Sequence, residues 1–219
     1  MPAQMPPDLP TPIIYLITDG QAKTPTLAAD SERLLRLVRA AVRARVSLIQ
    51  LREKNLSARS LYELTARASA LTAGSATKLL VNDRADIARA AGADGVHLTT
   101  TSLAPHIVQH AFGADFLIGV STHTLAEARA AREGGADFAV FGPVFATPSK
   151  SLYGAPVGLA ALRAAAETLK PFPLIALGGI TRENAVSTLK AGASGVAAIR
   201  ALGEAHDLEE TVHAMRWML

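Results

Sequence analysis

The sequence contains no cysteine in its 219 residues, which excludes disulfides, catalytic thiolates and thiolate metal sites. Aromatic residues are scarce, at 5%, and no apolar run approaches the length that a membrane-spanning helix needs. The charge imbalance is small, with 22 basic and 19 acidic residues and a formal net charge of +3. These features argue against a membrane protein and against a nucleic-acid-binding protein, and they suit a small anionic ligand.

The remaining composition is that of an ordinary globular domain, with 49% hydrophobic and 19% charged residues. Residues 1–12 include five prolines, which predicts an extended N-terminal segment ahead of a single domain over residues 13–219. This segment lacks the basic start and the apolar stretch of a signal peptide, so we expect a cytoplasmic protein.

Short apolar runs alternate with longer helical patterns along the whole domain. Most of these runs are continuously apolar, as in strands that are covered on both faces. The expected strands are 13–18, 47–51, 78–81, 95–98, 116–120, 138–141, 174–177 and 196–199. Eight βα units in one domain predict an α/β protein with a single (β/α)8 TIM barrel, and the competing architecture is an open doubly wound sheet.

Capping residues mark the helices between these strands. Helix starts are expected at Ser57, Thr124, Thr181 and Asp207, and glycines at 74, 134 and 192 are expected to end the first three.

Polar residues follow the second expected strand in an informative pattern. Gln50, Arg52 and Lys54 alternate with other residues, so an extended backbone would project all of them from one face. Two cations and an amide are costly as core packing and well suited to binding an anion.

The other expected strands end in polar or glycine residues as well. In a barrel these ends converge on one mouth, where active sites of this fold are built. The residues concerned are Asn82, Asp83, His97, Thr99, Ser121, His123, Thr147, Ser149, Lys150, Gly178, Gly179 and Arg200.

Some of these residues also have purely structural interpretations. Asp83 could cap the following helix as well as bind a ligand, His97 could be a hydrogen-bonded core histidine, and His123 could lie in a surface loop. For Lys150, the two other cations at Arg52 and Lys54 favour a functional interpretation.

The residues imply two anion sites. The first would combine Arg52, Lys54 and Lys150 with the hydroxyl groups of Thr147 and Ser149. Asp83 could add Mg²⁺ there, since this ion often binds one or two carboxylates together with substrate phosphates. The second would use backbone N–H groups around Gly178, Gly179 and the element after the last strand. Such a pair of sites suggests a transferase that joins two phosphorylated molecules.

Several motifs, taken together and in order, resemble the thiamine phosphate synthase / thiazole tautomerase superfamily. The likeness runs from about residue 14 to residue 202. The motifs are Tyr15-Leu-Ile-Thr-Asp19, Gln50-Leu-Arg-Glu-Lys54, Val81-Asn-Asp-Arg84, Gly95-Val-His-Leu98, Gly119-Val-Ser-Thr-His-Thr124, Gly142-Pro-Val-Phe-Ala-Thr-Pro-Ser-Lys150 and Ala176-Leu-Gly-Gly-Ile180.

For the synthase, the resemblance implies an aminopyrimidine diphosphate and a thiazole phosphate as substrates. Gln50 and Ser121 would lie near the pyrimidine, and the thiazole phosphate would bind at Gly178 and Gly179. Asp83 would hold Mg²⁺. The residues implied around the diphosphate are Arg52, Lys54, Asn82, Thr147, Ser149 and Lys150.

Two positions depart from the superfamily pattern. Ser102 stands where the superfamily usually has an aspartate that is a second Mg²⁺ ligand, and Arg200 stands where a serine near the phosphate is common. These departures leave two alternatives: a tautomerase that uses His123 for proton transfer without Mg²⁺, and a non-catalytic protein that binds thiamine precursors. The oligomeric state stays open, with a homo-oligomer among the alternatives.

Overall fold

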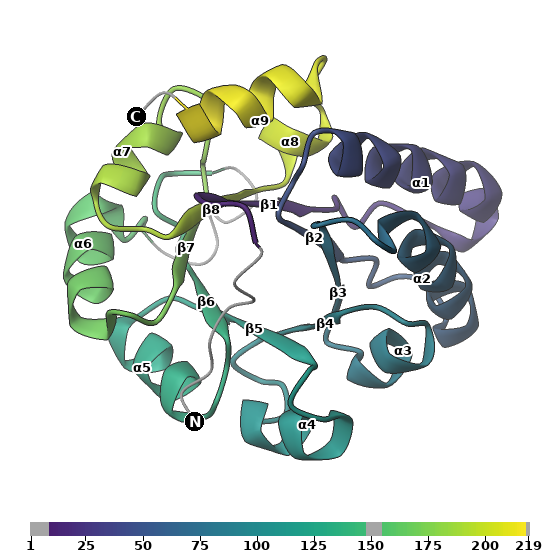
Figure 1. Cartoon of the computed structure of the whole chain (residues 1–219), viewed down its shortest axis with the longest axis horizontal. Helices are drawn as coiled ribbons and strands as arrows, with labels where there is room; N and C mark the ends of the chain where they lie inside the picture. Colours follow the sequence, from purple (N-terminus) through teal and green to yellow (C-terminus); the bar gives the residue numbers. More distant parts are fainter. Residues whose placement is uncertain (1–8, 148–154, 218–219) are drawn as a thin grey trace.

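The computed structural model describes residues 9–147 and 155–217. Eight parallel strands close into a barrel in the order β1 to β8, which confirms the predicted TIM barrel and rules out the open sheet (Figure 1). The strands are β1 Ile13–Ile17, β2 Leu48–Leu51, β3 Lys78–Asn82, β4 Gly95–Leu98, β5 Leu117–Thr122, β6 Phe138–Phe141, β7 Leu174–Leu177 and β8 Gly195–Ala198.

Helices surround the barrel and connect its successive strands (Figure 1). In α1, for example, Leu34, Leu35, Val38 and Ala41 recur at helical spacing and all are buried. The helices are η1 Thr24–Thr26, α1 Leu27–Arg43, α2 Ala58–Thr72, α3 Ala85–Ala90, α4 Pro105–Phe112, α5 Leu125–Glu133, α6 Gly158–Leu169, α7 Ala185–Lys190, α8 Arg200–Gly203 and α9 Leu208–Trp217.

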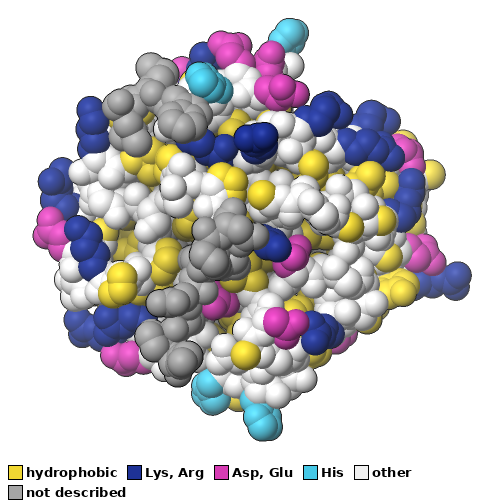
Figure 2. Space-filling model, in the orientation of Figure 1, with side chains coloured by type: hydrophobic (Ala, Val, Ile, Leu, Met, Phe, Trp, Pro, Cys, Tyr) yellow, Lys and Arg dark blue, Asp and Glu magenta, His cyan; other side chains and the backbone are white. Residues whose placement is uncertain are grey.

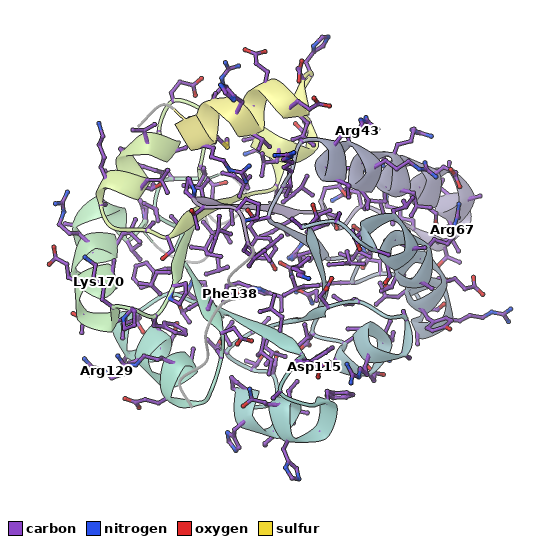
Figure 3. The ribbon with its side chains drawn as sticks, viewed as in Figure 1. Arg43, Arg67, Asp115, Arg129, Phe138 and Lys170 are labelled. Carbon is purple, nitrogen blue, oxygen red and sulfur yellow. The ribbon has the colours of Figure 1, made fainter. Side chains whose placement is uncertain are left out.

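A compact inner core fills the barrel, separate from the larger core between the strands and the helices. Phe138 is fully buried inside the ring of strands, whereas Arg67, Arg129 and Lys170 project outward (Figure 3). Gly119 makes room for the phenyl ring of Phe138, because a Cβ atom on residue 119 would lie 2.3 Å from Phe138 Cζ. Leu9 also belongs to the inner core, so the N-terminal segment, whose residues 1–8 lie outside the described part, contributes at least one packed residue.

Three of the four predicted helix caps are confirmed. The hydroxyl groups of Ser57 and Thr124 and the carboxylate of Asp207 each accept a backbone N–H from the first turn of their helices. Thr181 was wrong as a cap, because α7 begins four residues later. The side chain of Asn184 takes the Thr181 N–H instead, at 2.8 Å, and holds the chain in a turn.

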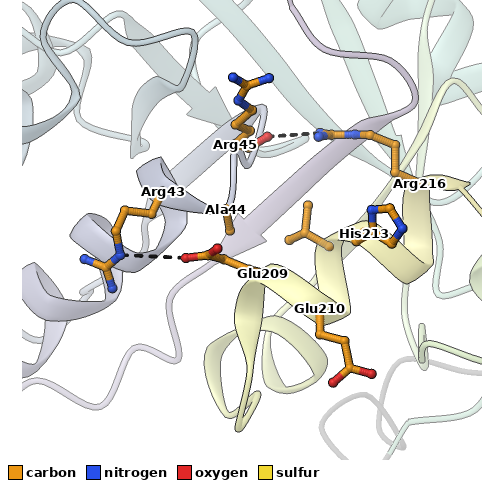
Figure 4. Close-up of a pocket in the computed structure, with 8 residues that line it drawn as sticks. Arg43, Ala44, Arg45, Glu209, Glu210, His213 and Arg216 are labelled. Atoms are coloured by element: carbon orange, nitrogen blue, oxygen red, sulfur yellow. Dashed lines mark hydrogen bonds and ion pairs between the residues drawn. The ribbon is translucent and has the colours of Figure 1, made fainter.

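The last helix, α9, packs beside α1 at the amino end of the barrel (Figure 4). Arg216 Nη2 donates to the carbonyl of Arg45 at 3.0 Å and to Ser47 Oγ at 3.2 Å. A hollow of about 370 Å³ lies beside this contact. One of its carboxylates, Glu209, is paired with Arg43. We therefore assign this region a structural role, in which it links early and late parts of the domain.

The surface carries charges of both signs. On the face seen in Figure 2, basic and acidic side chains alternate around the perimeter, which fits the small net charge. Among the described residues, none of the helices combines the length and the hydrophobicity that crossing a membrane requires.

Candidate active site at the carboxyl ends of the strands

A chain of hydrogen bonds crosses the carboxyl half of the barrel and links five strands. Gln50 Nε2 donates to Asn82 Oδ1 at 3.0 Å, and the hydroxyl of Tyr15 lies 3.3 Å from Gln50 Oε1. The same hydroxyl lies 3.1 Å from Nδ1 of His97, whose Nε2 is 2.9 Å from Ser121 Oγ. Gln50, Asn82 and Ser121 were predicted site residues, and the structure brings them together.

Burial controls the ionisation of this chain. His97 is 2% exposed. Desolvation, assisted by the nearby charge of Arg52, lowers the pKa of His97 to about 3, so the ring is uncharged at neutral pH. Desolvation also raises the pKa of Tyr15 well above its usual value, so the phenol keeps its proton. The interpretation of His97 as a hydrogen-bonded core histidine is confirmed, but the residue also contacts two polar groups of the site.

Arg52 and Glu53 directly follow β2 and lie in different surroundings. Glu53 is buried, where its carboxylate accepts from Thr18 Oγ1 at 2.6 Å and from the N–H of Ala22 at 3.0 Å. Arg52 is half-buried on the other side, close to Gly20, and its side chain makes no ion pair with a described residue. The Arg52 backbone is held independently, because its N–H donates to Thr18 Oγ1 at 2.9 Å. A cation that pairs with no carboxylate of the described residues is thus held at the mouth.

Lys54 lies beyond the end of β2, in a turn, and is exposed. It lines a hollow of about 560 Å³ at the ends of β2, β3 and β4, together with Asn82, Asp83, Thr99 and Thr101. The strand alternation that predicted one face for Gln50, Arg52 and Lys54 therefore stops at Leu51, and the turn brings Lys54 to the same rim.

Asp83 is exposed at this hollow with a positive φ of 60°. Its interpretation as a helix cap was wrong, since Arg84 occupies the N-cap position of α3 and no side chain caps that helix. The Asp83 carboxylate instead accepts a hydrogen bond from Ser102 Oγ, which also takes the Thr99 N–H at 2.8 Å. Position 102 thus faces Asp83 directly.

Among the residues that line this hollow, Asp83 is the exposed carboxylate that could contribute to a metal site. Asp83 offers one exposed carboxylate beside the hydroxyl group of Ser102. In residues 9–147 and 155–217, no group of three or more His, Cys, Asp or Glu side chains is placed to hold a metal ion. Mg²⁺ is compatible with one carboxylate when a bound diphosphate supplies further oxygens.

The loops after β6 and β7 pack tightly against each other. Gly178 and Gly179 have φ values of 99° and 63°, and a Cβ on Gly179 would lie 2.7 Å from the carbonyl oxygen of Ala146. Asn184 Nδ2 donates to the Gly179 carbonyl at 2.8 Å and fixes the turn. Arg200 begins α8 after the neighbouring strand and is exposed. Gly178, Gly179 and Arg200 thus lie just after the neighbouring strands β7 and β8, and their role in binding an anion stays a prediction.

The predicted residues of the β6 loop are only partly described. Thr147 is half-buried beside this turn, whereas Ser149 and Lys150 lie outside the described residues. His123 follows β5, and its Nδ1 bonds to the Gly142 carbonyl, which can only accept. Nδ1 therefore carries a proton, and Nε2 is the nitrogen left for a ligand.

Sequence reasoning did not identify Tyr15 or Glu53 as parts of the site, and for His97 it left both a place at the mouth and a core position open. Tyr15 and His97 are separated by 82 positions, so their contact leaves no local pattern. Polarity could have revealed Tyr15 and His97, because each places a polar group within an otherwise apolar strand.

Comparisons with known proteins identify the family. The family model described as Thiamine monophosphate synthase matches residues 14–202. A thiamine-phosphate synthase of Anaeromyxobacter dehalogenans is 44% identical over 178 residues, covering 81% of this chain and 79% of the relative. One from Chlorobium phaeobacteroides is 38% identical over 208 residues, covering 95% of this chain and 96% of the relative. The solved structure of a thiamine phosphate pyrophosphorylase from Pyrococcus furiosus is similar with a TM-score of 0.79 and 32% identity, covering 93% of both chains. The resemblance expected from the motifs is thus confirmed, and the chain belongs to the thiamine monophosphate synthase family.

Proposed function

We propose that this protein is a thiamine phosphate synthase, a transferase of thiamine biosynthesis. It couples a hydroxymethylpyrimidine diphosphate to a thiazole phosphate and releases diphosphate. Family membership supports this reaction, and the arrangement of Arg52 carries the argument at the level of the site. Arg52 is a half-buried guanidinium without a carboxylate partner among the described residues, next to a neutral chain of hydrogen-bonding groups.

The proposed reaction breaks the bond between the pyrimidine methylene carbon and the diphosphate oxygen. The electron pair leaves with the diphosphate, and the carbocation that remains on the pyrimidine is captured by the thiazole nitrogen. No protein nucleophile is required. Cations stabilise the charge that develops on the leaving group, and this is the role we assign to Arg52, Lys54 and Lys150.

We assign the remaining contacts by position. Gln50 and Ser121 would face the pyrimidine, and Asn82, Thr147 and Ser149 would bind the diphosphate. The thiazole phosphate would bind the backbone at Gly178 and Gly179, with Arg200 beside it.

Mg²⁺ is part of the proposal, with Asp83 as its protein ligand. When bound, the ion would neutralise part of the diphosphate charge. The hydroxyl group of Ser102 contacts the same carboxylate and cannot replace a second one, so we expect binding to depend on phosphate oxygens. We also propose a cytoplasmic location, because both substrates carry phosphate groups that do not cross a membrane unaided.

The test supplies both phosphorylated precursors to the purified protein, with Mg²⁺ and after treatment with a chelator. We expect thiamine phosphate and diphosphate in equal amounts, and a lower rate without the ion. Conversion of a thiazole carboxylate phosphate into its aromatic isomer, without coupling, would select the tautomerase and refute the synthase. Tight binding of either precursor without any product would select the non-catalytic alternative.

A further inference from the structure

The buried hydrogen-bond chain described above has a direction that the bonded groups themselves determine. Its outer members are Asn82 and Ser121, and Gln50, Tyr15 and His97 lie between them. Each group in the chain has a limited number of protons, so only a few arrangements can satisfy all four contacts.

The contact between Gln50 and Asn82 determines the direction of the first two hydrogen bonds. Gln50 Nε2 donates to Asn82 Oδ1, which turns Gln50 Oε1 toward Tyr15. Gln50 is 2% exposed, and among the described residues the one donor to its side-chain carbonyl is the Tyr15 hydroxyl at 3.3 Å. The single proton of Tyr15 is therefore used on Gln50, because a buried carbonyl without a donor is strongly disfavoured.

The remaining steps follow from the neutral ring. Since Tyr15 gives its proton to Gln50, the phenol oxygen must accept from His97 Nδ1, at 3.1 Å. An uncharged imidazole carries one proton, so its Nε2 has none and must accept from Ser121 Oγ, at 2.9 Å. The opposite direction would have Tyr15 donate to His97 and would leave the Gln50 carbonyl without its donor.

We infer that Tyr15 and His97 are positioning residues that orient the hydrogen bonds of the site from Ser121 to Asn82. This inference rests on the proposed function and deepens it. The Ser121 proton points inward to His97, so Ser121 presents only lone pairs to the mouth. At the other end, the Asn82 amide nitrogen makes no hydrogen bond with a described residue and presents N–H donors. The site thus selects a substrate whose ring offers a donor, such as an amino group, to Ser121. The same substrate must offer an acceptor oxygen to Asn82.

Substrate selection follows from this polarity. A pyrimidine diphosphate with an amino group satisfies Ser121, whereas an analogue with an oxo group places two acceptors against each other. Buried polar groups that lose their partner discriminate strongly between analogues. Anionic oxygens at Asn82 also polarise the whole chain and strengthen the acceptor at Ser121.

The first measurement reads the tautomer of His97 directly. Protein labelled with ¹⁵N-histidine is studied by long-range ¹H–¹⁵N correlation NMR at neutral pH, and the His97 signals are assigned by their loss in His97→Gln. We expect the proton on Nδ1 in the wild-type protein. A proton on Nε2, or on both nitrogens, would overturn the inference.

The second measurement tests whether the hydrogen-bond chain determines the preference between pyrimidine substrates. Tyr15→Phe keeps the ring and removes the hydroxyl, so we expect the preference for the amino over the oxo pyrimidine diphosphate to fall by about tenfold or more, mainly through KM. Thr122→Val is the matched control, because it removes a buried hydroxyl that donates to the Val140 carbonyl at 3.1 Å outside the chain. An unchanged preference in Tyr15→Phe, or an equal loss in the control, would refute the positioning role.

The two measurements separate this inference from the proposed function. The NMR result does not depend on turnover, and it decides the direction of the chain even if Tyr15→Phe fails to fold. Wild-type protein with the Nδ1–H ring but no thiamine phosphate formation would refute the synthase and support the chain direction.

Discussion

Arg52 offers the sharpest test of the proposed mechanism. Replacement by alanine removes a half-buried cation that has no carboxylate partner among the described residues. The local backbone keeps its hydrogen bond from the Arg52 N–H to Thr18 Oγ1 at 2.9 Å, which does not involve the removed side chain. We therefore expect little change in folding stability and a large change in turnover.

The magnitude follows from electrostatics. Two unit charges about 4 Å apart interact by about 4 kcal/mol at an effective dielectric constant near 20. Single donors to a developing anion contribute about 2–4 kcal/mol of transition-state stabilisation. Arg52→Ala should therefore lower kcat by roughly 30-fold to 900-fold.

The assay follows diphosphate release with saturating substrates, alongside thermal unfolding. Arg52→Lys should recover part of the lost rate, since the charge returns without the planar guanidinium. Arg59→Ala is the control, because the Arg59 side chain is exposed on α2 and pairs with Glu63 at 2.9 Å. Turnover of Arg52→Ala within threefold of the wild type, with normal unfolding, would refute the assignment of Arg52 to the leaving group.

Three further predictions concern other parts of the barrel. Burial raises the pKa of Asp137 to about 6, so the wild-type protein loses stability as the pH rises and the buried carboxyl ionises. Asparagine does not ionise, so between pH 4 and pH 7 the unfolding free energy of Asp137→Asn in urea should rise by about 3 kcal/mol relative to the wild type; parallel pH profiles would contradict this. Ser102→Asp places a second carboxylate beside Asp83 and should tighten Mg²⁺ binding by about tenfold or more in calorimetric titrations, whereas equal affinities would argue against a metal at Asp83. His123→Ala should lose only the bond from Nδ1, at about 1 kcal/mol of stability, and retain coupling turnover within a few fold; loss of coupling would make His123 catalytic.

The sequence was sufficient for the architecture because the relevant signals are local. Continuous apolar runs located the strands, and the structure reproduces runs such as Gly95–Leu98, Phe138–Phe141 and Leu174–Leu177 at their predicted bounds. Capping at Ser57 and Thr124 was also readable, since the partners lie three residues apart.

The site was predictable only where polar residues lie at or just after the carboxyl ends of strands. Gln50, Asn82 and Ser121 were found in this way, and the hydrogen-bond chain joins them. Tyr15 was missed because its strand neighbours are apolar, and its partners are 35 and 82 positions away. Glu53 was given no role from the sequence, and its bonds to Thr18 and Ala22 span more than 30 positions.

Thr181 and Asp83 show the opposite error. Both have residue types that favour helix caps, but tertiary contacts decided otherwise. Asn184 captures the Thr181 N–H, and Asp83 faces Ser102 across the rim. Local propensity therefore placed the right kinds of residue near helix starts and could not assign their partners.

The seam between β1 and β8 has a consequence for synthesis in the cell. Ile13 pairs with Gly195, and Arg216 bonds to the carbonyl of Arg45, so both contacts join early and late parts of the chain. During translation, the first strand stays without one neighbour until β8 has been synthesised. Nascent chains should therefore expose a strand edge for most of their elongation, a stage at which chaperones have a ready target.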